Sequence, residues 1–522
     1  MIKRKILWVD DEIDLLRPHI IFLGERGYSV SPATNGKDAL CLIKREPFDL
    51  VLLDEMMPGL GGLSLLSEIK EIDPNLPVVM ITKSEEEELM EEAIGKNITD
   101  YLTKPVNPSQ ILSVCKRILD AKHIRGERIA RDYAAISSTI RSMLSSPISW
   151  KDWIEIYSKL SEWDLEIEGC RDHALSQIHA DQRRECNAQF GRYVEESYPL
   201  WLRGEDAPPL SVDVVSKFLS PLLASGQKVF FVIIDCMRLD QWLYIKPLLA
   251  EFFNIRCNYY YSILPTATPY SRNALFSGLF PDQIAEMYPE MWKEANLDEQ
   301  GINRYEHQLL DRQLRKLGFN FKRTGYIKVF DAAGEERLAR EMNSLLRRFN
   351  SSAVPLVSIV FNFIDVLAHG RSKSEILHQI APDEAAFRSL TRSWFNHSVL
   401  FTMLREIADT KAVVVLTSDH GSIFGNRATI AYGDKSTSTN LRYKYGGNLG
   451  CNSREAVMIE NPRNFRLPSF GTATNYIIAK EDYYFVYPTG FHEYERKYRG
   501  SFQHGGISME EMILPLAVMR PK

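Results

Sequence analysis

Residues 413–425, VVVLTSDHGSIFG, place an acidic and a basic side chain directly after an apolar run. Adjacent residues on a strand point to opposite faces, but where a strand ends the backbone turns and both side chains can reach one point. The pattern therefore predicts a buried strand whose exit delivers Asp419 and His420 to a functional site. A loop Asp beside a capping His is the simpler alternative, and partners elsewhere in the chain decide between the two.

Other apolar runs end in similar residues. KVFFVIIDCMRLD ends at an Asp, LVSIVFNFIDVLAHG ends at an Asp with a His four residues later, and SFQHGGISMEEM has a His before two glycines, which let the backbone approach closely. Mixed His and Asp ligands suit Zn²⁺ or Mn²⁺ better than Mg²⁺, and six of them suit two metals roughly 4 Å apart. The candidate metal ligands are Asp235, Asp365, His369, Asp419, His420 and His504.

The stretch SILPTATPYSRNALFSG supplies hydroxyl groups. Pro269 suits the first turn of a helix, so Thr268 is predicted at a helix N-terminus, where free N–H groups and the helix dipole favour an anion. A metal would lower the pKa of the Thr268 hydroxyl and make it a nucleophile toward phosphorus, with Thr266 as the alternative. Arg272 and Asn273, one turn later, either contact a phosphoryl oxygen or pack the helix.

The first 120 residues alternate strand-like and helix-like segments, which predicts a parallel, doubly wound (flavodoxin-like) sheet. Strand-like runs end at Asp10 and Asp11, at Asp54, at Thr82 and before Lys104. Because chemistry in such sheets collects at the carboxyl ends of the strands, the three carboxylates should converge there. A hard cation, Mg²⁺, suits their oxygen ligands.

These segments resemble the receiver domain of bacterial two-component response regulators. The likeness rests on the acidic pair, an Asp before MMPGLGG, a Thr after the next strand and a Lys-Pro. It implies that Asp54 accepts phosphate from a sensor histidine kinase and that phosphorylation drives dimerisation. It further implies that Asp11, Asp54 and the Met56 carbonyl hold Mg²⁺, with Asp10 acting through a water. Thr82 and Lys104 would bind the phosphoryl oxygens, and Tyr101 would be the switch aromatic.

The middle of the chain predicts helices. Gly is sparse between residues 121 and 209, and Trp150, Trp153, Tyr157 and Leu160 recur at helical spacing. A small helical bundle linking two domains is predicted, with a partner-binding face as the alternative. DNA binding is disfavoured, because the arginines of this segment are balanced by acids.

The order Asp, Thr, Asp-x3-His, Asp-His-Gly, His-Gly resembles the alkaline phosphatase superfamily and, within it, the PglZ domain. The resemblance implies two Zn²⁺ ions, one held by Asp235, Thr268, Asp419 and His420 and the other by Asp365, His369 and His504. Thr268 would form a phosphothreonine ester that water then releases. Pro directly after this Thr departs from related phosphodiesterases. The Cys-x-Pro-x-Arg context of sulfatases is absent from the sequence, so a sulfatase is set aside.

Taken together, the chain is similar to response regulators linked to the type IX secretion system of Bacteroidetes. It is expected to be an α/β multidomain protein, with a receiver (1–122), a helical-bundle linker (123–209) and an alkaline-phosphatase-like α/β effector (210–522). The resemblance implies oligonucleotide or cyclic nucleotide phosphodiesters as substrates, although a monoesterase would fit the metals equally well. The rival is a metal-stabilised module that docks a sigma factor or a secretion component, with incidental hydrolysis.

A polar loop, residues 426–450, carries Arg442 and Lys444, which either bind the second ester arm of a substrate or are solvated. At 45% hydrophobic and 25% charged residues, with a net charge of -5, the 522-residue chain has the composition of soluble globular proteins. No apolar run approaches the ~20 residues of a membrane span. The seven cysteines form no CxxC pair and are expected to be reduced thiols, so a cytoplasmic location is predicted.

Overall fold

The computed structural model describes residues 4–59, 61–83, 98–169, 172–292, 303–351, 354–371, 374–434, 437–471 and 474–522. The chain divides into two compact units, Met1–Asp132 and Tyr133–Lys522, each treated separately below. None of the described helices has the length and apolar character that crossing a bilayer requires.

The first unit is a five-stranded parallel sheet in the order β2-β1-β3-β4-β5. Its central strands are buried along their whole length, as expected for a sheet covered on both faces. This confirms the predicted doubly wound receiver fold. The elements are β1 (Arg4–Val9), α1 (Arg17–Gly24), β2 (Tyr28–Ala33), α2 (Gly36–Arg45), β3 (Leu50–Asp54), α3 (Gly62–Ile72), β4 (Val78–Thr82), β5 (Asp100–Thr103) and α5 (Pro108–Cys115).

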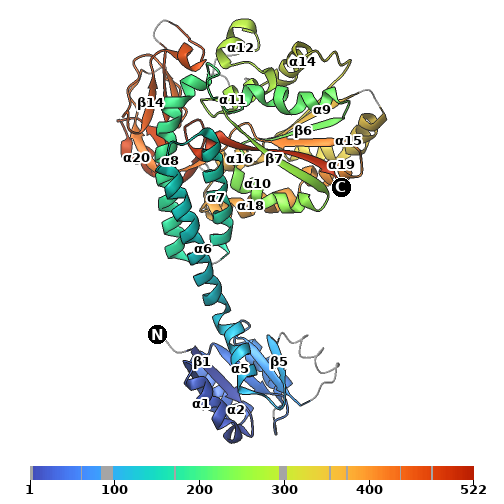
Figure 1. The fold of residues 1–522 in the computed structure, drawn as a ribbon, viewed down its shortest axis with the longest axis vertical. Coiled ribbons are helices and arrows are strands. Elements are labelled where there is room, and N and C mark those ends of the chain that lie inside the picture. The colour runs from blue at the N-terminus through green and yellow to red at the C-terminus, as the bar shows by residue number, and fades with distance from the viewer. Residues whose placement is uncertain are drawn as a thin grey trace. The chain divides into compact units, whose positions relative to one another are not determined.

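Three long helices follow, namely α6 (Ala121–Leu144), α7 (Trp150–Glu168) and α8 (His173–Trp201). Ser149 and Asp172 cap the N-termini of α7 and α8 through their side chains, which explains where these helices begin. α7 and α8 lie side by side (Figure 1). The predicted apolar stripe of α7 is buried in the same hydrophobic core as the effector sheet, so α7, α8 and the effector share one compact unit.

The effector is built on a six-stranded sheet in the order β7-β18-β10-β6-β9-β8. β8, β9, β6 and β10 are parallel to one another, whereas β18 pairs in antiparallel fashion with β10 on one side and with the edge strand β7 on the other. The predicted apolar runs correspond to the parallel strands β6, β9 and β10, which are fully buried. The bounds are β6 (Val229–Ile234), β7 (Phe253–Tyr261), β8 (Gly325–Val329), β9 (Leu356–Phe361), β10 (Val413–Thr417) and β18 (Ile513–Pro521).

Helices cover both faces of this sheet, with α11 and α14 on one side and α10 and α18 on the other (Figure 1). They are α9 (Ser220–Ala224), α10 (Leu239–Ala250), α11 (Thr268–Ser277), α12 (Pro281–Met287), α14 (Glu306–Lys316), α15 (Ala332–Ser351), α16 (Phe363–Arg371), α17 (Glu375–Ile380), α18 (Glu384–His397), α19 (Val399–Ala408), α20 (Phe491–Tyr498) and α21 (Met509–Met512).

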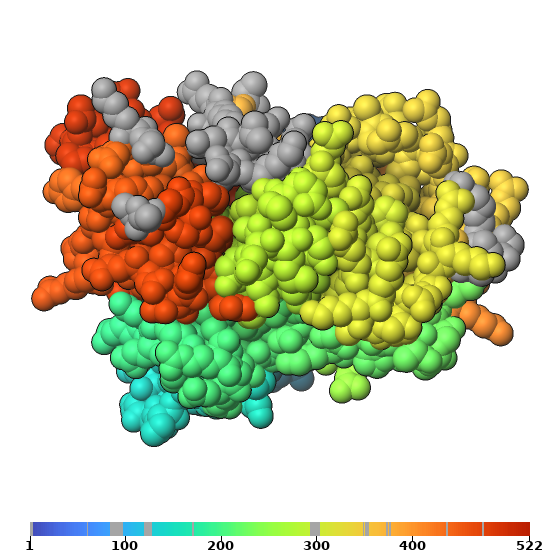
Figure 2. All heavy atoms as spheres, turned by 90° about the horizontal axis from the view of Figure 1, so that it is seen from above, coloured from blue at the N-terminus to red at the C-terminus, as the bar shows by residue number. Residues whose placement is uncertain are grey.

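Short strands fill the segment between β10 and β18. β11 (Ile423–Gly425) pairs with β17 (Ser501–Gln503), β12 (Arg427–Ile430) pairs with β16 (Tyr483–Val486), and β15 (Asn475–Ala479) lies between β13 (Tyr443–Gly446) and β14 (Ala456–Ile459). Figure 2 shows this part, in orange and red, lying against the yellow-green segment that contains α12. There the Asp282 N–H donates to the Arg466 carbonyl at 3.1 Å. The predicted polar loop 426–450 thus contains two strands, β12 and β13.

Candidate active site

The predicted metal ligands follow the carboxyl ends of neighbouring strands. Asp235 comes directly after β6, Asp419 and His420 come after β10, and α16, which follows β9, carries two more ligands. β9, β6 and β10 are parallel and adjacent in the sheet, so their exits meet at one edge. β17 ends one residue before His504 and delivers it to the same place.

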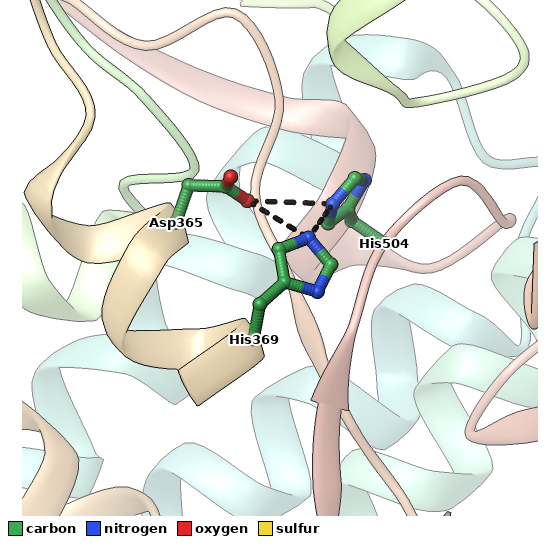
Figure 3. A group of neighbouring side chains, drawn as sticks. All are labelled: Asp365, His369 and His504. Atoms are coloured by element: carbon green, nitrogen blue, oxygen red, sulfur yellow. Dashed lines mark hydrogen bonds and ion pairs between the residues drawn. The ribbon is translucent and has the colours of Figure 1, made fainter. Parts of the chain in front are cut away.

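The first group of ligands is Asp365, His369 and His504 (Figure 3). The Nε2 atoms of the two imidazoles lie 2.9 Å apart, and each is 3.4 Å from Oδ1 of Asp365. Burial alone would raise the pKa of Asp365, but the two imidazoles outweigh it and hold this pKa well below its usual range. Asp365 and His369 lie one helical turn apart on α16, as their spacing predicted.

The second group is Asp235, Asp419 and His420, and all three side chains are fully buried. His420 Nε2 lies 3.6 Å from Asp235 Oδ1 and 3.7 Å from Asp419 Oδ2. Burial lowers the pKa of His420 to about 4, so the imidazole is neutral at pH 7. Burial also raises the pKa of Asp235 well above its usual range.

The two groups adjoin each other. The imidazole rings of His420 and His504 stack with their centroids 4.4 Å apart and an interplanar angle of 24°. The structure therefore brings together all six side chains that the sequence singled out as metal ligands. Their binding of zinc stays a prediction.

The donor set fits divalent cations. Within the described part of the chain, Oδ1 of Asp235 and Oδ1 of Asp419 are buried and have no hydrogen-bond partner. A buried carboxylate oxygen without a partner is costly, and a bound cation would satisfy both oxygens. Neutral imidazole and carboxylate together are the ligands of two-metal hydrolytic sites.

Thr268 and Thr266 lie in different surroundings. Thr268 is the first residue of α11, as predicted, and its Oγ1 is 2.9 Å from His420 Nε2. The Thr266 hydroxyl instead donates to the Gly506 carbonyl at 2.8 Å and accepts from Gly505 N–H at 3.1 Å. Thr268 thus faces the ligand groups, whereas Thr266 fastens the glycine loop that follows His504.

Arg272 and Asn273, expected either to contact a phosphoryl oxygen or to pack the helix, are both buried on α11. The Arg272 guanidinium forms ion pairs with Asp235 and Asp419, the second at 3.0 Å, and its Nη1 lies 3.6 Å from Glu306. Burial would raise the pKa of Asp419, but Arg272 outweighs burial and lowers it. Asn273 donates to the Pro269 carbonyl at 2.9 Å. Arg272 therefore binds carboxylates of the candidate metal site, and its contact with a phosphoryl oxygen stays a prediction.

Arg442 and Lys444 also lie elsewhere than predicted. Arg442 is fully buried and donates through Nε and Nη2 to the two carboxylate oxygens of Glu511, at 3.1 and 2.5 Å. Lys444 is 1% exposed, donates to the Ser438 carbonyl at 3.1 Å and lies 4.7 Å from the ring centre of Tyr487. The expectation of a substrate contact is therefore corrected for Arg442, because Glu511 neutralises its charge inside the protein.

Three features of the site carry no local signal in the sequence. Cys236, directly after Asp235, has a φ of 67°, a left-handed conformation that is uncommon outside glycine and turns the chain at the strand exit. Asn303 is buried and donates to the Thr268 carbonyl at 3.2 Å. Glu306, also buried, lies near both Arg272 and Lys328.

In the receiver, Asp10, Asp11 and Asp54 form a third group of convergent carboxylates, as the sequence predicted. Lys104 Nζ lies 2.8 Å from Asp54 Oδ1 and 3.0 Å from Asp10 Oδ2. Burial raises the pKa of Asp54, and the hydrogen bond from Lys104 opposes this.

The other predicted receiver residues are Thr82, Tyr101 and Met56. The Thr82 hydroxyl donates to Glu55, a residue that the sequence reading did not single out. Tyr101 is 41% exposed on β5, and the side chain of Met56 is exposed beyond the end of β3. Carboxylates of this kind suit Mg²⁺, and the roles of Thr82, Tyr101 and Met56 stay predictions.

Comparisons with known proteins agree with this architecture. The receiver segment is 35% identical over 112 residues to the regulatory protein VanRc of Enterococcus gallinarum, covering 22% of this chain and 48% of that protein. It is 32% identical over 121 residues to the phosphate regulon transcriptional regulatory protein PhoB of Pseudomonas aeruginosa, covering 23% and 53%. The chain thus spans about half the length of these curated relatives.

The solved structure of the chemotaxis protein CheY4 of Vibrio cholerae is 28% identical and covers 22% of this chain and 99% of its own, with a TM-score of 0.22. Family models match the chain in three consecutive segments: the response regulator receiver domain over residues 6–116, the PorX response regulator linker domain over residues 123–202, and the BREX system PglZ alkaline phosphatase-like domain over residues 214–519. The last model covers more than half of the chain, so the protein belongs to the PglZ family of alkaline phosphatase-like domains and has the receiver, linker and effector architecture of PorX-like response regulators.

Proposed function

We propose that this protein is a cytoplasmic response regulator, phosphorylated on Asp54 with Mg²⁺ by a sensor histidine kinase, whose effector domain is a two-zinc phosphodiesterase. Receiver, linker and effector span residues 1–122, 123–209 and 210–522. The substrates are oligonucleotide or cyclic nucleotide phosphodiesters, phosphorylation drives homodimerisation, and the output regulates type IX secretion. The PorX-type linker model supports the last point.

One observation carries the enzymatic part of the proposal: the Thr268 hydroxyl lies 2.9 Å from His420 Nε2, beside two groups of convergent ligands. Thr268 Oγ1 attacks phosphorus, the alcohol arm of the ester departs, and water then hydrolyses the phosphothreonine ester. The positive end of the α11 dipole lies at Thr268, where it favours the negative charge of the phosphoryl oxygens. Zinc, when bound to the six ligands, supplies positive charge for the phosphoryl group and lowers the pKa of the Thr268 hydroxyl.

The test compares wild type, Thr268→Val and Thr268→Ser on bis(4-nitrophenyl) phosphate, with zinc content measured in parallel. Valine has nearly the shape of threonine without the hydroxyl, so hydrolysis should fall about 1,000-fold or more. The serine variant keeps a hydroxyl and should retain part of the activity. Full activity in Thr268→Val would exclude Thr268 as the nucleophile.

The same assay separates the proposal from its rivals. Faster hydrolysis of 4-nitrophenyl phosphate than of the diester would make the protein a monoesterase. No turnover by zinc-loaded, phosphorylated wild type would leave the binding role, in which the effector docks a sigma factor or a secretion component.

A further inference from the structure

A four-residue helix, α21, contacts both loops that carry imidazole ligands. Gly421, which follows His420, donates its N–H to the Glu511 carbonyl at 3.1 Å. A Cβ atom on residue 421 would overlap the Glu510 carbonyl oxygen, so the two segments are in direct contact. Gly506, two residues after His504, donates its N–H to Glu511 Oε1 at 2.8 Å. The position of α21 therefore sets the position of both loops.

The side chain of Glu511 is held firmly in this arrangement. It is fully buried, accepts from the Ser508 hydroxyl at 2.7 Å and binds the guanidinium of Arg442 through both carboxylate oxygens. A Cβ atom on Gly506 would overlap that guanidinium. Gly506 is therefore required for the close approach of the backbone that the two glycines after His504 predicted.

The neighbouring side chain, Glu510, points to helix α8. Arg183 Nη1 donates to Glu510 Oε1 at 2.9 Å, and Asn187 Nδ2 donates to Glu510 Oε2, also at 2.9 Å. The Asn187 side chain further accepts from Met509 N–H at 2.9 Å. Glu510 is 1% exposed and Arg183 9%. Two residues of α8, one turn apart, therefore hold α21 through its side chain at Glu510 and its backbone at Met509.

The same polar cluster reaches α7 and α6. Arg183 also pairs with the carboxylate of Asp164 on α7, which accepts a hydrogen bond from His179 Nε2 at 2.8 Å. Nδ1 of His179 lies 3.2 Å from the hydroxyl of Tyr133 on α6, and this hydroxyl donates to Gln182 at 2.7 Å. An unbroken set of buried polar contacts therefore runs from α6 through α8 to α21.

Stability alone does not explain this cluster. Apolar residues of similar volume often stabilise a core as well as a buried ion pair does, because taking charges out of water is costly. Directional hydrogen bonds to a carboxylate, however, fix the position of its backbone, and partners behind metal ligands orient those ligands.

We propose that Arg183 and Asn187 are positioning residues for the candidate effector metal site, acting through Glu510 on the loops of His420 and His504. The inference rests on the proposed function, since it takes those two imidazoles as metal ligands. It makes α8, which lies outside the segment matched by the PglZ model, a structural part of the site. It also gives α6–α8, which follow the receiver in the chain, a defined contact through which to act on the effector.

The test compares Arg183→Met with Arg184→Met in the full chain. Arg184 is the next residue of α8 but is exposed and pairs with Asp181, so its variant is a matched control. Binding of Co²⁺ is followed by visible absorption, with excess Mg²⁺ keeping the probe off the receiver. Arg183→Met should bind Co²⁺ about 10- to 100-fold more weakly than wild type, and Arg184→Met should match wild type. A folded Arg183→Met with wild-type Co²⁺ affinity would overturn the inference.

A second variant separates positioning from general destabilisation. Arg183→Met/Glu510→Gln removes the charge of Glu510, one of the two carboxylates that pair with Arg183, so its thermal stability should recover in part while its Co²⁺ affinity stays low. Recovery of both would overturn the inference, because Arg183 would then act only by neutralising Glu510.

Hydrogen exchange of residues 418–425 and 501–512 in the metal-free protein gives an independent readout. Both segments should exchange faster in Arg183→Met than in Arg184→Met, and equal rates would count against positioning. Wild type that binds no Co²⁺ would overturn the proposed function, while this exchange comparison would still decide whether α8 positions the two loops.

Discussion

The imidazole rings of His420 and His504 stack 4.4 Å apart, although one follows β10 of the central sheet and the other follows the short strand β17. Each ring belongs to a different group of candidate ligands, so this contact joins the two groups into one site. A phosphoryl group could therefore be reached by ligands of both groups at once.

The two adjoining ligand groups, each expected to hold one ion, predict the zinc stoichiometry. Wild type should hold two zinc ions per chain, measured by mass spectrometry after dialysis in Mg²⁺, and His504→Ala should hold one. His492→Ala is the matched control, because the His492 side chain is exposed on α20 and touches neither group. Two zinc ions retained in His504→Ala would remove His504 from the ligand set.

Because the guanidinium of Arg272 is buried against two candidate metal ligands, the stability lost on replacing it should depend on whether zinc is bound. Removing one partner of a buried ion pair costs about 3–5 kcal/mol, because a charge is left without compensation. The loss of stability in Arg272→Met should be largest in the zinc-free protein, because bound zinc would neutralise the negative charges of Asp235 and Asp419. Arg238, equally buried, pairs with Asp240 and Glu384, which lie outside the ligand groups.

Thermal unfolding with and without zinc measures the difference. Arg238→Met should lose the same stability under both conditions, whereas Arg272→Met should lose less when zinc is present. Equal losses for Arg272→Met in both conditions would mean that no cation shares its carboxylates.

The ligand groups were predictable because their signal is local. Asp235, Asp365 and Asp419 each follow an apolar run, and exits of adjacent parallel strands meet at one edge whatever the rest of the chain does. The spacing of Asp365 and His369 required only a helical turn. The N-terminal position of Thr268 required only the proline that follows it.

The roles of the buried cations were not predictable, because their partners are distant in sequence. A polar stretch that contains Arg442 is typical of a solvated loop, yet Glu511, far along the chain, turns this arginine into a core residue. Arg272 lies on a helix buried on every side, so periodicity did not indicate which residues it faces. The antiparallel strands β7 and β18 also escaped prediction, since their pairing is set by tertiary contacts.

The burial of Lys444 predicts that the free energy of unfolding of the protein depends on pH. Burial lowers its pKa in the folded protein to about 8, below the value near 10.5 of an unfolded chain. The folded state thus binds the proton less well, and the free energy of unfolding should rise as pH increases between these two values. Lys444→Met removes the penalised charge and should raise that free energy at pH 7 by on the order of 3 kcal/mol, with the gain shrinking above pH 8.

Urea unfolding at pH 7 and pH 9.5 measures this gain, with the exposed Lys497→Met as the control. Diester hydrolysis by Lys444→Met should stay at the wild-type level, because its Nζ is occupied by the Ser438 carbonyl. A large rise in KM with no gain in stability would instead restore Lys444 to the substrate site.

Asp54 predicts the response to phosphorylation. Its carboxylate is buried beside Asp10 and lies 2.8 Å from Lys104, so a phosphoryl group placed there would meet a cation already in position. Acetyl phosphate with Mg²⁺ should convert wild type from monomer to dimer in sedimentation velocity, and Asp54→Ala should stay monomeric. Asp14→Ala, which removes an exposed carboxylate paired with Arg17, should dimerise like wild type. Unchanged sedimentation of phosphorylated wild type would show that Asp54 does not control assembly.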